Sequence, residues 1–396
     1  MAWRVMAVTV QEFMGRVKHA YRVSLPSLVI SLVIGFFGGT FLGKYLDKIS
    51  REYPGLLIIL PGMMGLRGNV FGSMASRFST MLYLGDLEPS LREKKVLKNI
   101  VIAMMLSLIP VTVLWAVGVI QGIRYHALDI LLIVVSSTIL VSIILGYFTG
   151  FVTIFAFRRD VDPDSMAAPL VASVGDLLTI PSLISFILLI EASRRAFWLG
   201  NAALIAVFLL LIMVSRVRKA EVLEFRELFT TVTALALLSL VSGFTLQRFS
   251  GLISASVLLG FAYPSILSSF GNYGSIIAAK TSTALHLGEV EGYLSKEPFM
   301  EMASLLLTAP IVGVLINVFG AVIAYLVAGV RIGPFYPLVI SYPLMVLFIM
   351  LYSYTISYFL FQRDIDPDSV AIPLISNNSD IFGTIYVVII AKMMVG

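Results

Sequence analysis

The chain has 396 residues, of which 59% are hydrophobic and only 13% are charged, and its mean hydropathy is +0.97. Soluble domains carry about 25% charged residues, so this composition excludes a soluble globular protein. The net charge of +5 does not indicate a nucleic-acid partner, because the basic residues lie in short connections between apolar runs. Without cysteine, the chain has neither disulfides nor thiolate metal ligands.

Apolar runs follow one another along nearly the whole chain, and each can cross the ~30 Å hydrocarbon core as a helix. We therefore predict an all-α polytopic membrane protein with about 11 transmembrane helices. In chain order, the predicted spans are 23–43, 54–83, 98–121, 128–157, 166–190, 197–215, 228–246, 251–286, 300–329, 334–361 and 370–392.

The first five and the last five spans correspond at an offset of 203 to 204 residues, whereas the sixth has no counterpart. Because five is odd, one extra crossing is needed to give two such units the same orientation. We therefore predict two parallel five-helix repeats joined by a linker helix, with a pseudo-two-fold axis along the membrane normal. The predicted divisions are a cytoplasmic segment (1–22), a first repeat (23–192), the linker helix and its loop (193–225), and a second repeat (226–396).

The distribution of Lys and Arg predicts a cell-membrane protein with a cytoplasmic N-terminus and an outside C-terminus. In that orientation, more basic residues fall in cytoplasmic connections, for example Arg92, Lys94 and Lys95, than in outside ones. Two outside connections, around Lys48 and Arg194, are also basic, which reduces the difference.

The second and eighth spans share a pattern of Pro, Gly and Asn. The matched residues are Pro61 and Pro264, Gly68 and Gly271, and Asn69 and Asn272. We expect Pro and Gly to break both helices, which would expose backbone carbonyls where a substrate binds. Asn69 and Asn272 would add side-chain carbonyls for a cation or its waters. The alternative role for the small residues is close helix packing.

A run of acids recurs at the start of the fifth and the last spans. Ten of the 18 positions from Arg159 to Asp176 are identical in the second copy, which runs from Arg363 to Asp380. The acids are Asp160, Asp162 and Asp164 in one copy, and Asp364, Asp366 and Asp368 in the other. The intervening prolines favour the first turn of a helix, with Asp162 and Asp366 as N-caps. Capping accounts for one acid per copy, and the crowding of three also indicates a vestibule that attracts cations.

Each copy ends in a single acid within an apolar span, Asp176 or Asp380. A carboxylate at mid-bilayer costs at least about 2.5–3.5 kcal/mol, so it is normally paired or functional. The structural alternative is a protonated Asp that hydrogen-bonds to a neighbouring helix. Equivalent acids in two repeats favour a cation site, since two ionised carboxylates repel unless a cation lies between them. Carboxylates, carbonyl oxygens and water suit Mg²⁺, and the three histidines form no cluster in the sequence for zinc or copper.

Taken together, these elements resemble known transport families. The five-span unit with Gly-Asn in its second span, a later Asp-Pro acid and then an intramembrane Asp resembles the MgtE family of magnesium channels. The tandem arrangement is similar to solute carrier family 41, especially in the strings Ala75-Ser76-Arg77-Phe78-Ser79-Thr80, Asp162-Pro163-Asp164 and Gly175-Asp176-Leu177. The resemblance implies Mg²⁺ transport, with Asp176 and Asp380 facing each other at the central site, Asp162 and Asp366 at the cytoplasmic mouth, and Asn69 and Asn272 nearby.

The chain also departs from the MgtE pattern. It lacks the cytoplasmic N domain and the paired CBS domains that MgtE channels usually carry, so gating by such a sensor is not expected. The Gln that follows Gly-Asn in many MgtE channels is absent, and Asn377 replaces Ser173 in the second copy. The secondary candidates for the site are Asp160, Asp164, Asp364, Asp368, Ser173 and Asn377.

We therefore predict a transporter of divalent cations, chiefly Mg²⁺ with Mn²⁺ or Co²⁺ as further cargo, and neither an enzyme nor a cofactor protein. Its partners would be the lipid bilayer and the cation. The sequence leaves open a channel or a Na⁺- or H⁺-coupled carrier, and a monomer or a homo-oligomer. The alternative function is an intramembrane aspartyl protease using Asp176 and Asp380, although its Tyr-Asp and Gly-x-Gly-Asp patterns are absent.

Overall fold

The structure is a computed structural model, and it describes residues 2–120, 126–159, 163–218, 221–222, 225–290, 292–365 and 367–395, with side chains omitted at 2–10, 163–169, 368 and 369. Within these ranges every regular element is a helix, and ten helical segments are long and apolar enough to cross a membrane by length and composition alone. The predicted all-α polytopic membrane fold is therefore confirmed. Helix α11 (Val257–His286) is not among the ten, because its serines, tyrosines and Asn272 lower its hydropathy.

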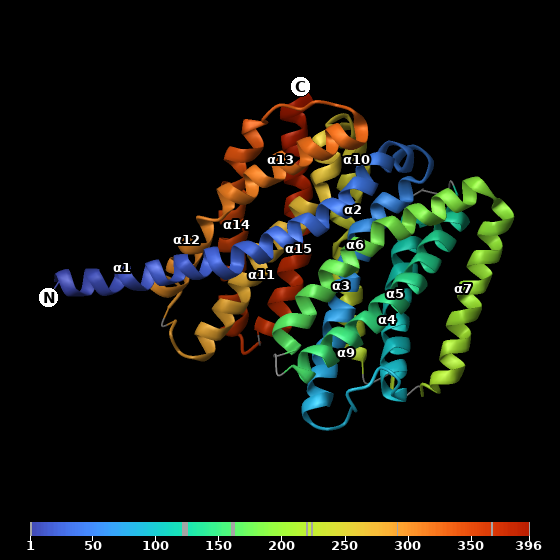
Figure 1. Cartoon of the computed structure of the whole chain (residues 1–396), viewed down its shortest axis with the longest axis horizontal. Coiled ribbons are helices and arrows are strands. Elements are labelled where there is room, and N and C mark those ends of the chain that lie inside the picture. Colours follow the sequence, from blue (N-terminus) through green and yellow to red (C-terminus); the bar gives the residue numbers. More distant parts are fainter. Residues whose placement is uncertain are drawn as a thin grey trace. The chain divides into compact units, whose positions relative to one another are not determined.

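The helices form two compact units (Figure 1). Unit 1 comprises Met1–Lys44 and Gly251–Gly396, and unit 2 comprises Tyr45–Ser250. Unit 1 contains α1 (Ala2–His19), the π-helical segment η1 (Ala20–Ser24), most of α2 (Leu25–Glu52), α11, α12 (Lys296–Leu306), α13 (Ala309–Ala328), α14 (Tyr336–Phe361) and α15 (Pro367–Val395). Unit 2 contains α3 (Pro54–Tyr83), α4 (Lys94–Ile120), α5 (Ala127–Arg158), α6 (Pro163–Ala192), α7 (Arg194–Ser215), α9 (Arg226–Leu238) and most of α10 (Leu240–Ala255).

Each compact unit contains most of one sequence repeat and the first helix of the other. In unit 1, a Cβ added to Gly39 of α2 would overlap the carbonyl oxygen of Phe261 on α11. In unit 2, a Cβ added to Gly243 of α10 would overlap the carbonyl oxygen of Ile58 on α3. Gly39 and Gly243 are equivalent in the two repeats, so the same close backbone approach occurs twice. The predicted boundaries divide the sequence, whereas the compact units exchange the first helices of the two repeats.

The small residues of α2 explain how this exchange is packed. Gly35 and Gly43 flank Gly39 at intervals of four residues, and a side chain at either position would meet α11 at Ser265 or Phe261. Such a stripe of small residues lets two helices approach closely in a membrane, where van der Waals packing drives association.

The prediction that the second and eighth spans are broken is wrong. Helices α3 and α11 each run through 30 residues without interruption, with Pro61 and Pro264 inside them. The glycines instead allow close packing, since a Cβ on Gly274 would lie 2.9 Å from the Ser353 hydroxyl of α14. The alternative role, helix packing through small residues, therefore accounts for this pattern.

Two further span boundaries differ from the prediction. Helix α10 continues to Ala255, beyond the predicted end at residue 246, and the predicted span 300–329 consists of two helices, α12 and α13. The predicted end at residue 246 precedes the polar Gln247 and Arg248, which α10 nevertheless includes, whereas the break between α12 and α13 falls within an apolar run.

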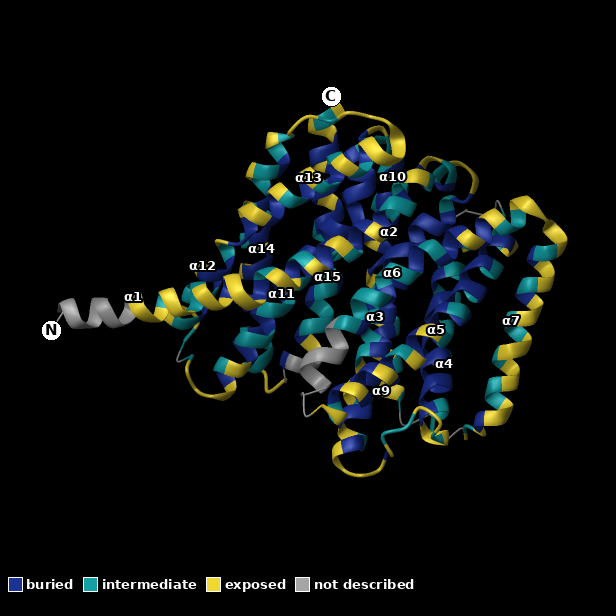
Figure 2. Ribbon diagram, in the orientation of Figure 1, coloured by how far each residue is buried: buried dark blue, intermediate teal, exposed yellow. Residues whose placement is uncertain are grey.

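The predicted linker helix corresponds to α7, which lies at the edge of unit 2. Most of its residues are exposed (Figure 2), including Leu209, Leu210 and Met213. One side is anchored, because Phe197 is buried and Asn201 accepts a hydrogen bond from the Ser136 hydroxyl of α5. An apolar surface of this kind suits contact with lipid.

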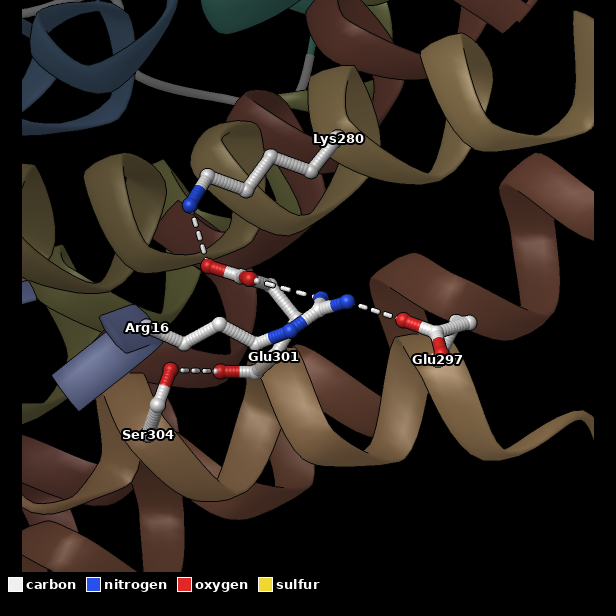
Figure 3. Close-up of polar contacts among 5 residues, drawn as sticks. All are labelled: Arg16, Lys280, Glu297, Glu301 and Ser304. Carbon is white, nitrogen blue, oxygen red and sulfur yellow. Dashed lines mark hydrogen bonds and ion pairs between the residues drawn. The ribbon is translucent and has the colours of Figure 1, made fainter. Parts of the chain in front are cut away.

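Helix α1 is tied to α12 by ion pairs within unit 1 (Figure 3). Arg16 pairs with both Glu297 and Glu301, and Glu301 also pairs with Lys280 of α11. These side chains and Glu12, His19 and Glu289 line an open pocket of about 760 Å³. Two carboxylates of this pocket, Glu297 and Glu301, have cationic partners, and these ion pairs connect α1 with α11 and α12.

Candidate functional site

In the first repeat, Asp176 lies in the middle of α6, which packs against α3, α5 and α7. Its side chain is partly buried. One turn further along α6, the Thr179 hydroxyl donates a hydrogen bond of 2.6 Å to the Gly175 carbonyl oxygen. The same hydroxyl accepts a hydrogen bond from Nη1 of Arg67, a residue of α3 that is only 1% exposed. The Arg67 guanidinium and the Asp176 carboxylate attract each other electrostatically.

The Gly68-Asn69 element of α3 lies at the same level of unit 2. A Cβ added to Gly68 would lie 3.5 Å from the Cβ of Ala172, which is one turn before Asp176 on α6. Asn69 follows directly and is partly buried. The structure thus brings together the helix segments that carry Asn69 and Asp176.

The second repeat has the corresponding helix contact in unit 1. A Cβ on Gly271 of α11 would lie 3.6 Å from the Ser376 hydroxyl of α15, which is one turn before Asp380. Asp380 is partly buried, and its backbone carbonyl accepts a hydrogen bond of 2.7 Å from the Thr384 hydroxyl. The Asn272 side chain is partly committed, since its Nδ2 donates to the Ser31 hydroxyl of α2 at 2.7 Å. The Asn272 side-chain oxygen is an acceptor of the kind that suits a cation or its waters.

The two repeats differ in the residues that surround these acids. Phe270 occupies the position equivalent to Arg67, and Gly383 occupies the position equivalent to Thr179. The Phe270 ring is fully buried and stacks on Tyr342, with 5.2 Å between ring centroids. Unit 1 therefore has a buried aromatic ring at the position where unit 2 has a buried guanidinium.

Much of the predicted cytoplasmic vestibule lies outside the described residues. Asp160, Asp162 and Asp366 fall in the gaps, and the side chains of Asp164 and Asp368 are not described. Asp364 is described, and it is exposed with a left-handed backbone (φ 58°). Helices α6 and α15 begin at Pro163 and Pro367, as predicted from the preference of Pro for the first helical turn. Ser173 is partly buried and Asn377 is buried.

Within the described ranges, no group of three or more His, Cys, Asp or Glu residues could hold a metal ion together. A Mg²⁺ site does not need such a group, since this ion is usually bound through one or two carboxylates. A single carboxylate with carbonyl oxygens and water is how a protein holds a Mg²⁺ ion that keeps most of its hydration shell. This chemistry suits an ion in passage better than a structural metal centre.

Comparison with known proteins identifies the family. The family model for MgtE, described as a divalent cation transporter, matches residues 60–186 and again residues 263–390. The chain belongs to the MgtE family. The two matches cover equivalent parts of the two repeats, and each includes the Gly-Asn element and the intramembrane aspartate.

This MgtE-family chain is also similar to curated proteins of solute carrier family 41. It is 24% identical over 300 residues to member 2 of that family from Mus musculus, and 23% identical over 306 residues to member 2 from Homo sapiens. Each of these matches covers 71% of this chain and 52% of the relative. Member 3 from Rattus norvegicus is 25% identical over 256 residues, covering 62% of this chain and 55% of that protein. The chain thus spans about half the length of the curated relatives it matches. No solved structure matches it significantly.

The MgtE family is described as divalent cation transporters, and this description gives the protease alternative no support. Sequence reasoning gave no role to Arg67 and Thr179. Arg67 was visible as a charged residue inside an apolar span, directly before Gly68-Asn69. The signal that would have singled it out is the contrast with Phe270, which directly precedes the matching Gly271-Asn272 in the second copy.

Proposed function

We propose that the chain transports divalent cations across a cell membrane, with Mg²⁺ as the principal cargo and Mn²⁺ or Co²⁺ as further candidates. The observation that carries the proposal is the equivalence of Asp176 and Asp380. Each lies one turn beyond the point where its helix meets a Gly-Asn element, in a chain whose family is described as divalent cation transporters. Lone intramembrane acids of this kind mark ion pathways.

Both aspartates serve one cation pathway in this proposal, to which each repeat contributes an acid and an asparagine. This part of the proposal comes from the duplicated sequence. Asn69 and Asn272 supply carbonyl oxygens, and the acids of the Asp-Pro-Asp-Ser runs attract cations to the cytoplasmic end. The excess of Lys and Arg in alternate connections supports a cytoplasmic N-terminus.

The test is Mg²⁺ flux into proteoliposomes for the wild type and the Asp176→Asn/Asp380→Asn variant. The matched control is Asp47→Asn, which neutralises an exposed acid paired with Arg51 on the same helix. We expect flux in the wild type and the control, and its loss in the double variant. Imposed Na⁺ or H⁺ gradients distinguish a coupled carrier, whose flux they change, from a channel.

Two results would contradict the proposal in different ways. Unchanged flux in a folded double variant would remove the aspartates from the pathway. The absence of flux in the wild type for Mg²⁺, Mn²⁺ and Co²⁺ would contradict divalent cation transport itself.

A further inference from the structure

The first repeat contains a buried charged contact whose two members are both replaced in the second repeat. Arg67 Nη1 donates to Thr179 Oγ1, between α3 and α6. At the equivalent positions, a Cβ added to Gly383 would lie 3.2 Å from Cδ2 of Phe270, between α11 and α15. The helix contact is thus kept, while the donor and the acceptor are both absent from the second repeat.

The Arg67 side chain is incompletely satisfied where it lies. Its guanidinium stays protonated in proteins and carries five N–H donors. It is only 1% exposed, and its Nη2 atom is buried without a hydrogen-bond partner. A buried cation in this condition is costly unless an anion lies close by.

Asp176 is the anion available to Arg67 in unit 2. Thr179, which holds Nη1, is three residues after Asp176 and therefore on the same face of α6. The two opposite charges attract each other across this helix contact. At the equivalent level of unit 1, the aromatic ring of Phe270 stacks on Tyr342 and meets Tyr386 edge-on.

We propose that Arg67 is a built-in counter-ion of Asp176, which makes the two aspartates unequal as cation sites. The inference rests on the proposed function. A fixed guanidinium opposes a divalent cation at Asp176, so Asp176 binds Mg²⁺ more weakly than Asp380 does. Arg67 thereby sets the affinity of the first repeat for its cargo and is a specificity-determining residue.

The affinity test uses Mg²⁺ titration of the purified full-length protein by calorimetry, with Arg67→Met, Arg67→Gln and Arg67→Lys. Removing the charge should strengthen Mg²⁺ binding at the weaker site about tenfold, because a unit charge acts strongly over a few ångströms in a buried site. Arg67→Lys retains the charge and should retain the wild-type affinity. The matched control is Arg77→Met on the same helix, where the guanidinium lies over the Phe225 ring, 4.2 Å from its centroid.

The second arm repeats Arg67→Gln in the Asp176→Asn background and needs no transport. The neutral Asn leaves the guanidinium without its anion, so Asp176→Asn should lower Tm more when Arg67 is present than in the Arg67→Gln background. The shift in Mg²⁺ affinity should disappear in the same background. Arg67→Gln is used here because its amide can still donate a hydrogen bond to Thr179. A change in Tm is then less affected by loss of packing at this position.

Additive Tm losses, or an unchanged Mg²⁺ affinity in both Arg67→Met and Arg67→Gln, would overturn the inference while leaving transport intact. A wild type that moves no divalent cation would overturn the proposed function. In that case the stability cycle still decides whether Arg67 and Asp176 are coupled.

Discussion

In the first repeat, Arg67 of α3 donates a hydrogen bond to Thr179 of α6, whereas in the second repeat Phe270 of α11 lies against Gly383 of α15. The helices approach each other similarly around these pairs. A Cβ added to Gly68 or to Gly271 would meet the helix that carries the intramembrane aspartate, α6 or α15, at nearly the same distance. The two repeats therefore share the way in which these helices approach each other. They differ in the side chain before the Gly-Asn element, which is the charged Arg67 in the first repeat and the aromatic Phe270 in the second.

The largest expected effect comes from transferring the charge into the second repeat with Phe270→Arg. The guanidinium would enter a stack formed with Tyr342 and Tyr386 and would face Gly383, which offers no side-chain acceptor. We expect a loss of about 4 kcal/mol in the free energy of unfolding. Thermal unfolding followed by size-exclusion chromatography in detergent measures it.

The double variant Phe270→Arg/Gly383→Thr restores the hydroxyl partner found in the first repeat and should recover part of this loss. If Phe270→Arg alone has the same unfolding temperature as the wild type, a buried arginine is tolerated equally in both repeats. That result would contradict the difference described between the surroundings of Arg67 and Phe270.

The next effect tests the contacts that both repeats share. Gly39→Ala and Gly243→Ala each drive a methyl group into a backbone carbonyl oxygen, which no rotamer can relieve. We expect each to cost about 3 kcal/mol of unfolding free energy. Gly251→Ala is the control, because nothing lies within 4 Å of its added Cβ. A large difference between the two substitutions would mean that the repeats are not packed alike.

A smaller effect is expected from Thr179→Val. The change removes the acceptor of the Arg67 hydrogen bond and leaves a second nitrogen of the guanidinium unsatisfied. We expect destabilisation of about 2 kcal/mol, which should shrink in the Arg67→Met background. Thr233→Val is the control, since the Thr233 hydroxyl donates a hydrogen bond to the Phe229 carbonyl of its own helix. Equal losses in both backgrounds would show that Thr179 acts independently of Arg67.

The smallest effect concerns the connection between the repeats. A hydrogen bond from Lys98 Nζ and another from the backbone N–H of Arg218 lower the pKa of Glu221 below its ordinary value. Since the folded pKa is depressed, the contribution of Glu221 to stability is complete above its unfolded pKa and disappears as pH falls through the folded pKa. The decrease in Tm between about pH 6 and pH 3 should therefore be smaller in Glu221→Gln than in the wild type. Identical pH profiles would exclude this connection as a stabilising element.

The membrane class and most of the helices could be predicted because long apolar runs and an internal repeat are strong signals in the sequence. The continuity of α3 through Pro61 could not, since neighbouring helices satisfy a proline inside a membrane span. The exchange of the first helices could not be predicted either. An apolar helix such as α2 can pack against either repeat, so its sequence does not indicate which one it contacts. The role of Arg67 could not be predicted, because its hydrogen-bond partner Thr179 lies 112 positions away in the sequence.

The exchanged first helices have a consequence for how the chain is made. Helix α2 leaves the ribosome more than 200 residues before Phe261, the residue whose carbonyl its Gly39 meets, and α3 likewise waits for Gly243. During synthesis, Gly39 of α2 and Ile58 of α3 therefore remain without their final neighbours until the second half has been inserted. A fragment ending at residue 225 lacks α9, α10 and the helices that cover Gly39, so neither half of this duplicated chain contains a complete folding unit.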